Sequence, residues 1–239
     1  MHGPKRKDVV VRTHELVLRQ VEADLAAGKL RLGDRLPGER ALAGQLGVSR
    51  PSVREAIRVL EAMGVVRTAV GSGPDAGAVI VADPGSPLTA TLRLHLATSH
   101  LPMGDIVQTR VLLESWAVRE AAGRAEPVQL AAAGRLLDAM DDPDLPRERF
   151  HLLDAEFHVA LAALAGNVLV STIMASLREA IHGYVMAAAP NLPAWDPVAA
   201  GLRAEHRAVL AAVAGGDGDT AARLVAEHIE GFYRASRLA

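Results

Sequence analysis

Three histidines and one aspartate in the C-terminal half of this 239-residue chain have the types and spacing of a metal site. Asp154 and His158 are four residues apart, so on a helix they share a face about one turn apart. His206 and His228 lie on either side of the breaker Gly215–Gly218, so an antiparallel helical hairpin folded there brings the two imidazoles level. Three imidazoles and one carboxylate suit a borderline divalent ion, with zinc preferred and nickel or manganese as alternatives.

The same four residues have a second interpretation, in which each histidine is separately satisfied by local partners at a helix end. The residue pattern alone does not decide between the two. If a metal is bound, three or four protein ligands leave a position open for water or an outside oxygen ligand. Such a position would also permit metal-assisted hydrolysis or lyase chemistry, with Glu156 or Glu205 as the general base. Most of the remaining histidines lie near helix ends or on mixed faces, and we assign no role to His2, His14, His95, His100 and His151.

A row of arginines near the N-terminus indicates a different chemistry. Arg50, Arg54 and Arg58 recur every four residues, on a helix face centred roughly 110° from an apolar stripe. That stripe consists of Val53, Ala56, Ile57 and Leu60. One face can pack while the other meets DNA. Periodicity alone is equally compatible with a solvated arginine face paired to Glu55 and Glu61.

The charge distribution favours the DNA interpretation. Residues 1–70 hold 13 Lys and Arg against 8 Asp and Glu, whereas residues 71–239 hold 13 against 20. The formal net charge of −2 therefore hides a basic head on an acidic body. Only the head is expected to meet a polyanion.

The elements around the arginine row have the order of a winged helix-turn-helix domain. We expect helices at about 9–27, 39–46 and 50–63, with Ser49 as the N-cap of the third. The β-prone segments 65–70 and 78–81 then form a hairpin around a glycine-rich turn. We predict that this DNA-binding domain spans residues 1–82 and that Asp83-Pro84-Gly85-Ser86-Pro87 is a linker.

The rest of the chain, residues 88–239, is predicted to be an all-helical antiparallel bundle. Seven helices with short connections are expected, at about 88–100, 103–123, 127–140, 146–165, 168–188, 197–214 and 219–237. The fold class is thus mainly α, with a winged helix-turn-helix followed by the bundle. Asp154, His158, His206 and His228 would then come from three of its helices.

Composition excludes several classes of protein. The absence of cysteine excludes a disulfide scaffold, a zinc ribbon and a thiol nucleophile, and it fits a reducing cytoplasm, where we place the protein. Aromatic residues are 3% of the chain, too few for base-stacking platforms. The longest uncharged run, Val159 to Leu177, contains Gly166-Asn167, so we interpret it as two helices rather than a membrane span. No apolar segment follows the charged N-terminus, so no signal peptide is expected.

Residues 28–71 resemble the DNA-binding domain of GntR-type bacterial repressors. The matching stretches are GKLRLGDRLPGERALA at 28–43, LGVSRPSVREAIRVLE at 46–61 and GVV at 64–66. The resemblance implies that Arg40, Arg50 and Arg54 contact operator DNA, together with Ser49 and Ser52 of the same stretch. It also implies that Gly71 reaches the minor groove and that a homodimer binds a palindromic operator. The hairpin tip at 73–77 is longer than the usual wing of the family.

Residues 88–234 resemble the all-helical FCD domain of the FadR subfamily of these regulators. The matching segments are TRVLLE at 109–114, LDAEFHVAL at 153–161, AGN at 165–167, EHRAV at 205–209 and His228. In metal-binding members the ligands match Asp154, His158, His206 and His228. The resemblance further implies a small carboxylate effector that completes the metal shell, with Arg110 as its ion-pair partner.

Together these features predict a metabolite-responsive transcription regulator, acting as a repressor. A divalent metal and a small carboxylate would bind in the helical domain and change operator affinity. The alternatives are a regulator that senses the metal ion itself and a metal-dependent enzyme.

Overall fold

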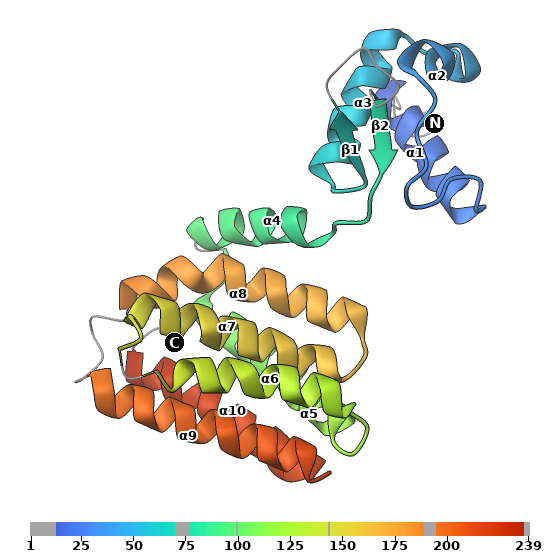
Figure 1. Ribbon diagram of the computed structural model, residues 1–239. Coiled ribbons are helices and arrows are strands. Elements are labelled where there is room, and N and C mark those ends of the chain that lie inside the picture. The colour runs from blue at the N-terminus through green and yellow to red at the C-terminus, as the bar shows by residue number, and fades with distance from the viewer. Residues whose placement is uncertain (1–12, 70–76, 99, 143, 189–194, 237–239) are drawn as a thin grey trace, which may run out of the picture. The chain divides into compact units, whose positions relative to one another are not determined.

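The computed structural model describes residues 13–69, 77–98, 100–142, 144–188 and 195–236. Over these ranges the chain forms ten helices and two strands (Figure 1). They divide into two compact units, Met1–Pro87 and Leu88–Ala239. The predicted mainly helical class, with a small strand hairpin in the first unit and helices in the second, is confirmed.

The first unit has the element order of a winged helix-turn-helix domain. Its elements are α1 (Thr13–Ala26), α2 (Glu39–Leu46), α3 (Arg50–Ala62), β1 (Val66–Ala69) and β2 (Gly77–Ile80). The two strands are antiparallel, with Val66 opposite Ile80. A single bridge pairs Arg35, in the connection before α2, with Val79 of β2. This connection therefore extends the small sheet by one short segment.

The apolar stripe predicted for α3 is the face that packs into the core. Val53 and Ala56 are fully buried and Leu60 is buried. Val17 and Val21 of α1 belong to the two apolar clusters that these residues build. Because the stripe is buried, the arginines of α3 are left on its outer face.

The tight turn between α2 and α3 is formed by a glycine and a serine cap. Gly47 ends α2 in the left-handed region, at φ 64°, which glycine adopts without strain. Ser49 then caps α3, as expected, because its hydroxyl oxygen accepts a hydrogen bond from the Ser52 backbone N–H at 3.2 Å. This turn sets the angle at which α3 leaves α2.

The second unit contains the predicted number of helices over the described residues. They are α4 (Gly85–Ala97), α5 (Met103–Ala121), α6 (Pro127–Met140), α7 (Arg147–Leu164), α8 (Val168–Ala188), α9 (Trp195–Ala214) and α10 (Gly218–Ser236). Residues 85–87, expected to be linker, are instead the first turn of α4. The Asp83 carboxylate accepts hydrogen bonds from the Ser86 N–H and hydroxyl, at 3.4 and 3.0 Å. Proline is tolerated in a first helical turn, so the local composition was misleading.

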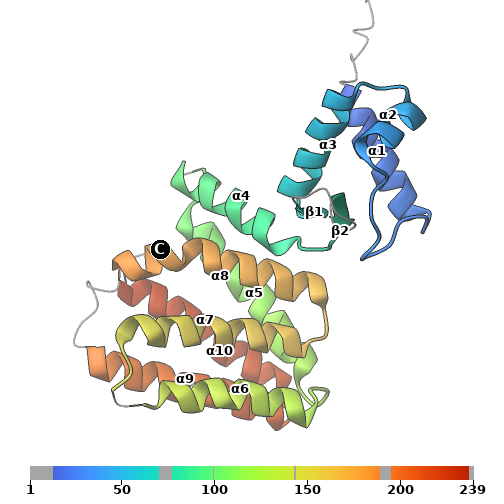
Figure 2. The same ribbon diagram turned by 45° about the horizontal axis from the view of Figure 1, so that its top comes forward.

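Six of these helices pack as neighbours in a ring, in the order α5, α8, α7, α6, α9 and α10 (Figures 1 and 2). α5 also packs across the ring against α7. No helix in the described part of the chain is long and apolar enough to cross a membrane. The uncharged run at 159–177 is divided between α7 and α8, with Gly166 in the left-handed region between them.

Gly64 joins the end of α3 to the segment that follows β2. Its φ is 69°, and a Cβ at this position would lie 2.0 Å from the backbone oxygen of Asp83. The Asp83 N–H also donates a hydrogen bond to the Gly64 carbonyl, at 3.1 Å. Neither the conformation nor the space permits a side chain here.

We therefore expect Gly64→Ala to destabilise the first unit by at least about 1 kcal/mol. Gly44 in α2 is the matched control, because a Cβ there meets nothing within 4 Å. Gly44→Ala should stabilise by roughly 0.5–1 kcal/mol, through helix propensity. Amide hydrogen exchange in α3 measures both changes. Equal protection in the two variants would contradict the expectation.

Candidate metal centre and nucleic-acid interface

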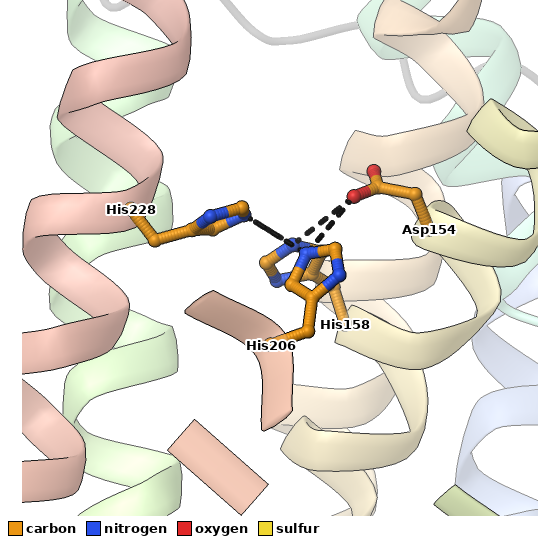
Figure 3. Close-up of side chains that lie close together, drawn as sticks. All are labelled: Asp154, His158, His206 and His228. Atoms are coloured by element: carbon orange, nitrogen blue, oxygen red, sulfur yellow. Dashed lines mark hydrogen bonds and ion pairs between the residues drawn. The ribbon is translucent and has the colours of Figure 1, made fainter. Parts of the chain in front are cut away.

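The structure brings together Asp154, His158, His206 and His228, from three helices. α7 supplies Asp154 and His158 from successive turns, and α9 and α10 supply one histidine each (Figure 3). One donor atom of each residue lies within 4.8 Å of the others. All three histidines are buried. The turn between α9 and α10 thus aligns His206 with His228 as the sequence midpoint predicted.

The spacing of the donor atoms fits a shared cation. His228 Nε2 lies 3.2 Å from His158 Nε2 and 3.1 Å from His206 Nε2. Asp154 Oδ1 lies 3.7 Å from His158 Nε2 and 3.2 Å from His206 Nε2. Neighbouring ligands bound about 2.1 Å from one ion are roughly 3.0–3.4 Å apart in octahedral or tetrahedral geometry. Three of these four separations lie in that range, and the fourth, between Asp154 and His158, is slightly longer. The residues present therefore fit a divalent ion.

Two carboxylates determine which ring nitrogens face the centre. Glu114 contacts Nδ1 of His158, and Glu205 Oε2 lies 2.6 Å from Nδ1 of His228. A carboxylate accepts hydrogen bonds, so each Nδ1 carries the proton and each Nε2 presents a lone pair. The Nε2 lone pairs of His158 and His228 thus face each other, an arrangement that is repulsive unless a cation or a proton lies between them.

Burial keeps the centre in the protonation state that binds metal. It lowers the pKa of His158 to about 3, and the carboxylates of Glu114 and Asp154 offset it only partly. Burial also lowers the pKa of His206. For Asp154 burial acts to raise the pKa, but the Arg178 guanidinium bonded to it holds that pKa well below the ordinary value. Neutral imidazoles and an ionised carboxylate are the metal-binding forms.

Arg110, predicted to pair with an effector carboxylate, has two protein partners in the structure. Its Nε and Nη2 lie 2.9 and 2.8 Å from Glu114 Oε1, and its Nη1 donates to the Tyr233 hydroxyl at 2.9 Å. Its side chain is only 3% exposed. A continuous chain of polar contacts therefore runs from Tyr233 through Arg110 and Glu114 to His158.

A small cavity of about 20 Å³ adjoins the centre, and sequence reasoning missed several of its residues. His151 lies one turn before Asp154 on α7, and this i, i+3 spacing was a signal that could have revealed it. Arg178 and His182 of α8 carry no comparable signal beyond their own spacing of four residues. All three line the cavity with Arg110.

The arginine face of α3 is exposed in the first unit. The side chains of Arg50, Arg54 and Arg58 are 62%, 55% and 76% exposed. Glu39 lies 3.7 Å from Arg50 and 3.8 Å from Arg54, so it holds both guanidinium groups only loosely. Exposed pairs at such distances contribute little stability and leave the arginines available to phosphate or base edges.

The other predicted DNA-contacting residues are divided between the described and undescribed parts. Arg40 is exposed on α2. The hydroxyls of Ser49 and Ser52 lie 2.9 Å apart at the start of α3, where the first also acts as the cap. Gly71 lies outside the described residues.

A winged helix-turn-helix with an exposed arginine face, joined to a helical domain with a buried polar centre, defines a ligand-regulated DNA-binding protein. Comparison with known families agrees. Residues 13–74 match the family described as bacterial regulatory proteins, gntR family, and residues 105–231 match the FCD domain. The chain therefore belongs to the GntR family and is a DNA-binding transcription regulator.

Individual relatives support this assignment. The chain is 29% identical over 223 residues to the "Putative L-lactate dehydrogenase operon regulatory protein" of Escherichia coli K12, covering 91% of this chain and 84% of the relative. It is 30% identical to the "HTH-type transcriptional repressor NanR" of Cronobacter sakazakii, over 92% and 83%. A solved structure, "Streptococcus agalactiae GntR", has the same fold, with a TM-score of 0.67 and 24% identity over 93% of this chain and 99% of that one.

These comparisons decide against the enzyme alternative. The family and its named relatives are transcription regulators. Glu156 and Glu205 therefore need no role as general bases. Glu205 instead contacts His228.

The buried Arg110–Glu114 pair generates a stability prediction. Arg110→Met should lower the free energy of unfolding by about 3–5 kcal/mol, because it leaves the Glu114 carboxylate buried without its cation. Arg119 lies on the same helix, but its bridge to Asp219 is exposed. Arg119→Met should therefore cost less than about 1 kcal/mol. Urea unfolding followed by Trp fluorescence measures both, and equal losses would contradict a structural role for the buried pair.

Proposed function

We propose that this chain is a metabolite-responsive transcription regulator whose helical unit binds a divalent metal and a small carboxylate effector. The observation that carries the proposal is the convergence of three buried imidazole nitrogens and one carboxylate oxygen. The Arg178 guanidinium contacts Oδ2 of Asp154, whereas Oδ1 of the same carboxylate lies toward the imidazole nitrogens of His158 and His206. A cation is the natural partner for such a set of electron-pair donors.

Asp154, His158, His206 and His228 would hold the ion. Three nitrogen ligands and one oxygen ligand suit zinc best, with nickel or manganese as alternatives. When bound, the metal would supply positive charge and a position for an oxygen ligand from outside the protein. Glu114 and Glu205 would keep two of the imidazoles in the ligating tautomer.

A small carboxylate is the effector class that we infer for this position. Anionic oxygen is attracted to a divalent ion, and Arg110 and Arg178 add positive charge at the cavity. The Escherichia coli relative is named for an L-lactate dehydrogenase operon, and lactate is itself a small carboxylate. A fatty-acyl effector fits less well, because a polar cavity is a poor host for an acyl chain.

On the DNA side, we infer that Arg40, Arg50 and Arg54 contact the operator, with Ser49 and Ser52 beside them. Gly71 would approach the minor groove from the hairpin tip. A homodimer on a palindromic operator would place one such surface on each half-site. We propose that the protein acts as a repressor in the cytoplasm, as the relative named a repressor also suggests.

Effector and operator binding must then be linked. If the effector changes operator affinity by some factor, the operator changes effector affinity by the same factor. The effector would act by changing how α7, α9 and α10 pack around the centre, because each of them carries a ligand.

A second candidate is a regulator that senses the metal itself. The small size of the cavity favours it, because about 20 Å³ has room for roughly one water and not for an organic acid. The two candidates predict different titrations. Operator release by Zn²⁺ alone, unchanged by any carboxylate, would select metal sensing.

Operator binding tests the role of α3. We expect Arg50→Ala to lose about 1–3 kcal/mol on an operator selected from random duplexes by the unaltered protein. Metal content should not change. Arg223→Ala is the control, because this exposed arginine pairs with Glu227 on α10 of the other unit. Fluorescence anisotropy at fixed salt measures both variants. A loss of the same size in each would remove α3 from the interface.

Metal content tests the centre. His206→Ala should purify with far less bound metal than the unaltered protein, as measured by plasma mass spectrometry, whereas His95→Ala, at an exposed position of α4, should keep it. Glu205→Gln is a milder variant at a half-exposed position and should weaken metal affinity about 10- to 100-fold without loss of folding. Full metal content in both site variants would refute the proposed ligand set.

A further inference from the structure

His151 is buried beside the candidate metal centre and makes no hydrogen bond through Nε2. Its side chain lines the cavity, and the residue is only 3% exposed. Its Nε2 has no hydrogen-bond partner in the described structure. The ring is otherwise held by aromatic neighbours, with Trp195 at 5.2 Å and Phe150 and Phe232 at 6.2 Å between ring centroids. A buried polar atom without a hydrogen bond costs free energy, so we expect His151 Nε2 to have a hydrogen-bond partner when the cavity is occupied.

His151 continues the row of ligands along α7. It precedes Asp154 by three residues and His158 by seven, so the three side chains share one helix face. At the standard helical rise His151 lies about 4.5 Å along the axis from Asp154. A molecule of a few atoms bound at the metal would therefore reach His151 with its far end. His182 of α8 lines the same cavity.

The charges around the cavity indicate what that far end carries. Among the charged groups that are largely buried, Arg110 and Arg178 balance Glu114 and Asp154. The other carboxylate at the centre, Glu205 beside His228, is 52% exposed, so water screens its charge. A divalent metal would then leave two buried positive charges without compensation. One carboxylate neutralises only one of them. Buried charge is strongly disfavoured unless it is paired, so a dianion is the ligand that completes the balance.

We propose that the effector is a short dicarboxylate, with one carboxylate at the metal and the second receiving a hydrogen bond from His151. This inference rests on the metal and carboxylate site proposed above and adds the second subsite. His151 is assigned as a specificity-determining residue.

The present size of the cavity has a consequence for binding. At about 20 Å³ it admits roughly one water, so a dicarboxylate enters only when the helices that line the cavity, α5, α7, α8 and α10, move apart. Arg178 is bonded to Asp154 and His182 is half-buried, and both belong to α8. The second carboxylate would thus change the packing of the helices around the cavity, including that of α8 against α7.

Calorimetry on the full chain loaded with Zn²⁺ tests the proposal. Succinate, butyrate and 4-hydroxybutyrate share a four-carbon chain and differ only at the far end. We expect succinate to bind at least about tenfold more tightly than the other two, as a hydrogen bond to a charged group implies. In His151→Phe, which keeps an aromatic ring against Trp195, this preference should disappear while butyrate affinity and zinc content stay the same.

Two further variants keep the test decisive. His151→Gln retains an N–H donor and should recover part of the succinate preference, and His95→Phe, an exposed histidine on α4, should leave it unchanged. Equal binding of succinate and butyrate, or an unaltered preference in His151→Phe, overturns the second subsite and leaves the proposed function intact. Tighter binding of 4-hydroxybutyrate than of succinate overturns the dicarboxylate assignment. Binding of none of the three acids defeats both proposals.

Discussion

The second unit is organised around the mutual repulsion of electron-rich atoms at its centre. Nε2 of His158 and Nε2 of His228 face each other at 3.2 Å, and in both rings the proton is on Nδ1, so neither Nε2 carries one. Glu114 and Glu205 impose this state, and Arg110 in turn holds Glu114. The packed helices therefore hold close together nitrogen atoms that would otherwise repel each other.

The two units differ in where their functional charges lie: exposed to water in the first and buried in the second. In the first, arginines remain in water on α3, where their charge is screened and costs little. At the centre of the second, arginines and carboxylates are removed from water and are paired with each other. Surface charge suits a polyanion that arrives already hydrated, whereas buried charge suits a small ligand that must exchange its water for fixed partners.

Much of this architecture followed from residue spacing. The four-residue step from Asp154 to His158 put these two residues on one helix face, and the breaker before α10 put His206 level with His228, since both depend only on helix geometry. That the two pairs meet depends on how α7 packs with α9 and α10, which the residue pattern left undecided and the family resemblance implied. The predicted start of α4, at about residue 88, was three residues too late. Asp83 caps the helix inside a proline-rich stretch that otherwise resembles a linker. Arg178 was missed because its partner is 24 residues away, and such pairings depend on how helices pack rather than on local pattern.

Asp83 forms hydrogen bonds in two directions along the chain. Its backbone is bonded to Gly64 at the end of α3, and its side chain caps the first turn of α4. The close approach at Gly64 leaves no room for a side chain beside the Asp83 carbonyl. A substitution at Asp83 would consequently disturb both the segment that follows α3 and the first turn of α4, because one residue holds the first through its backbone and the second through its side chain.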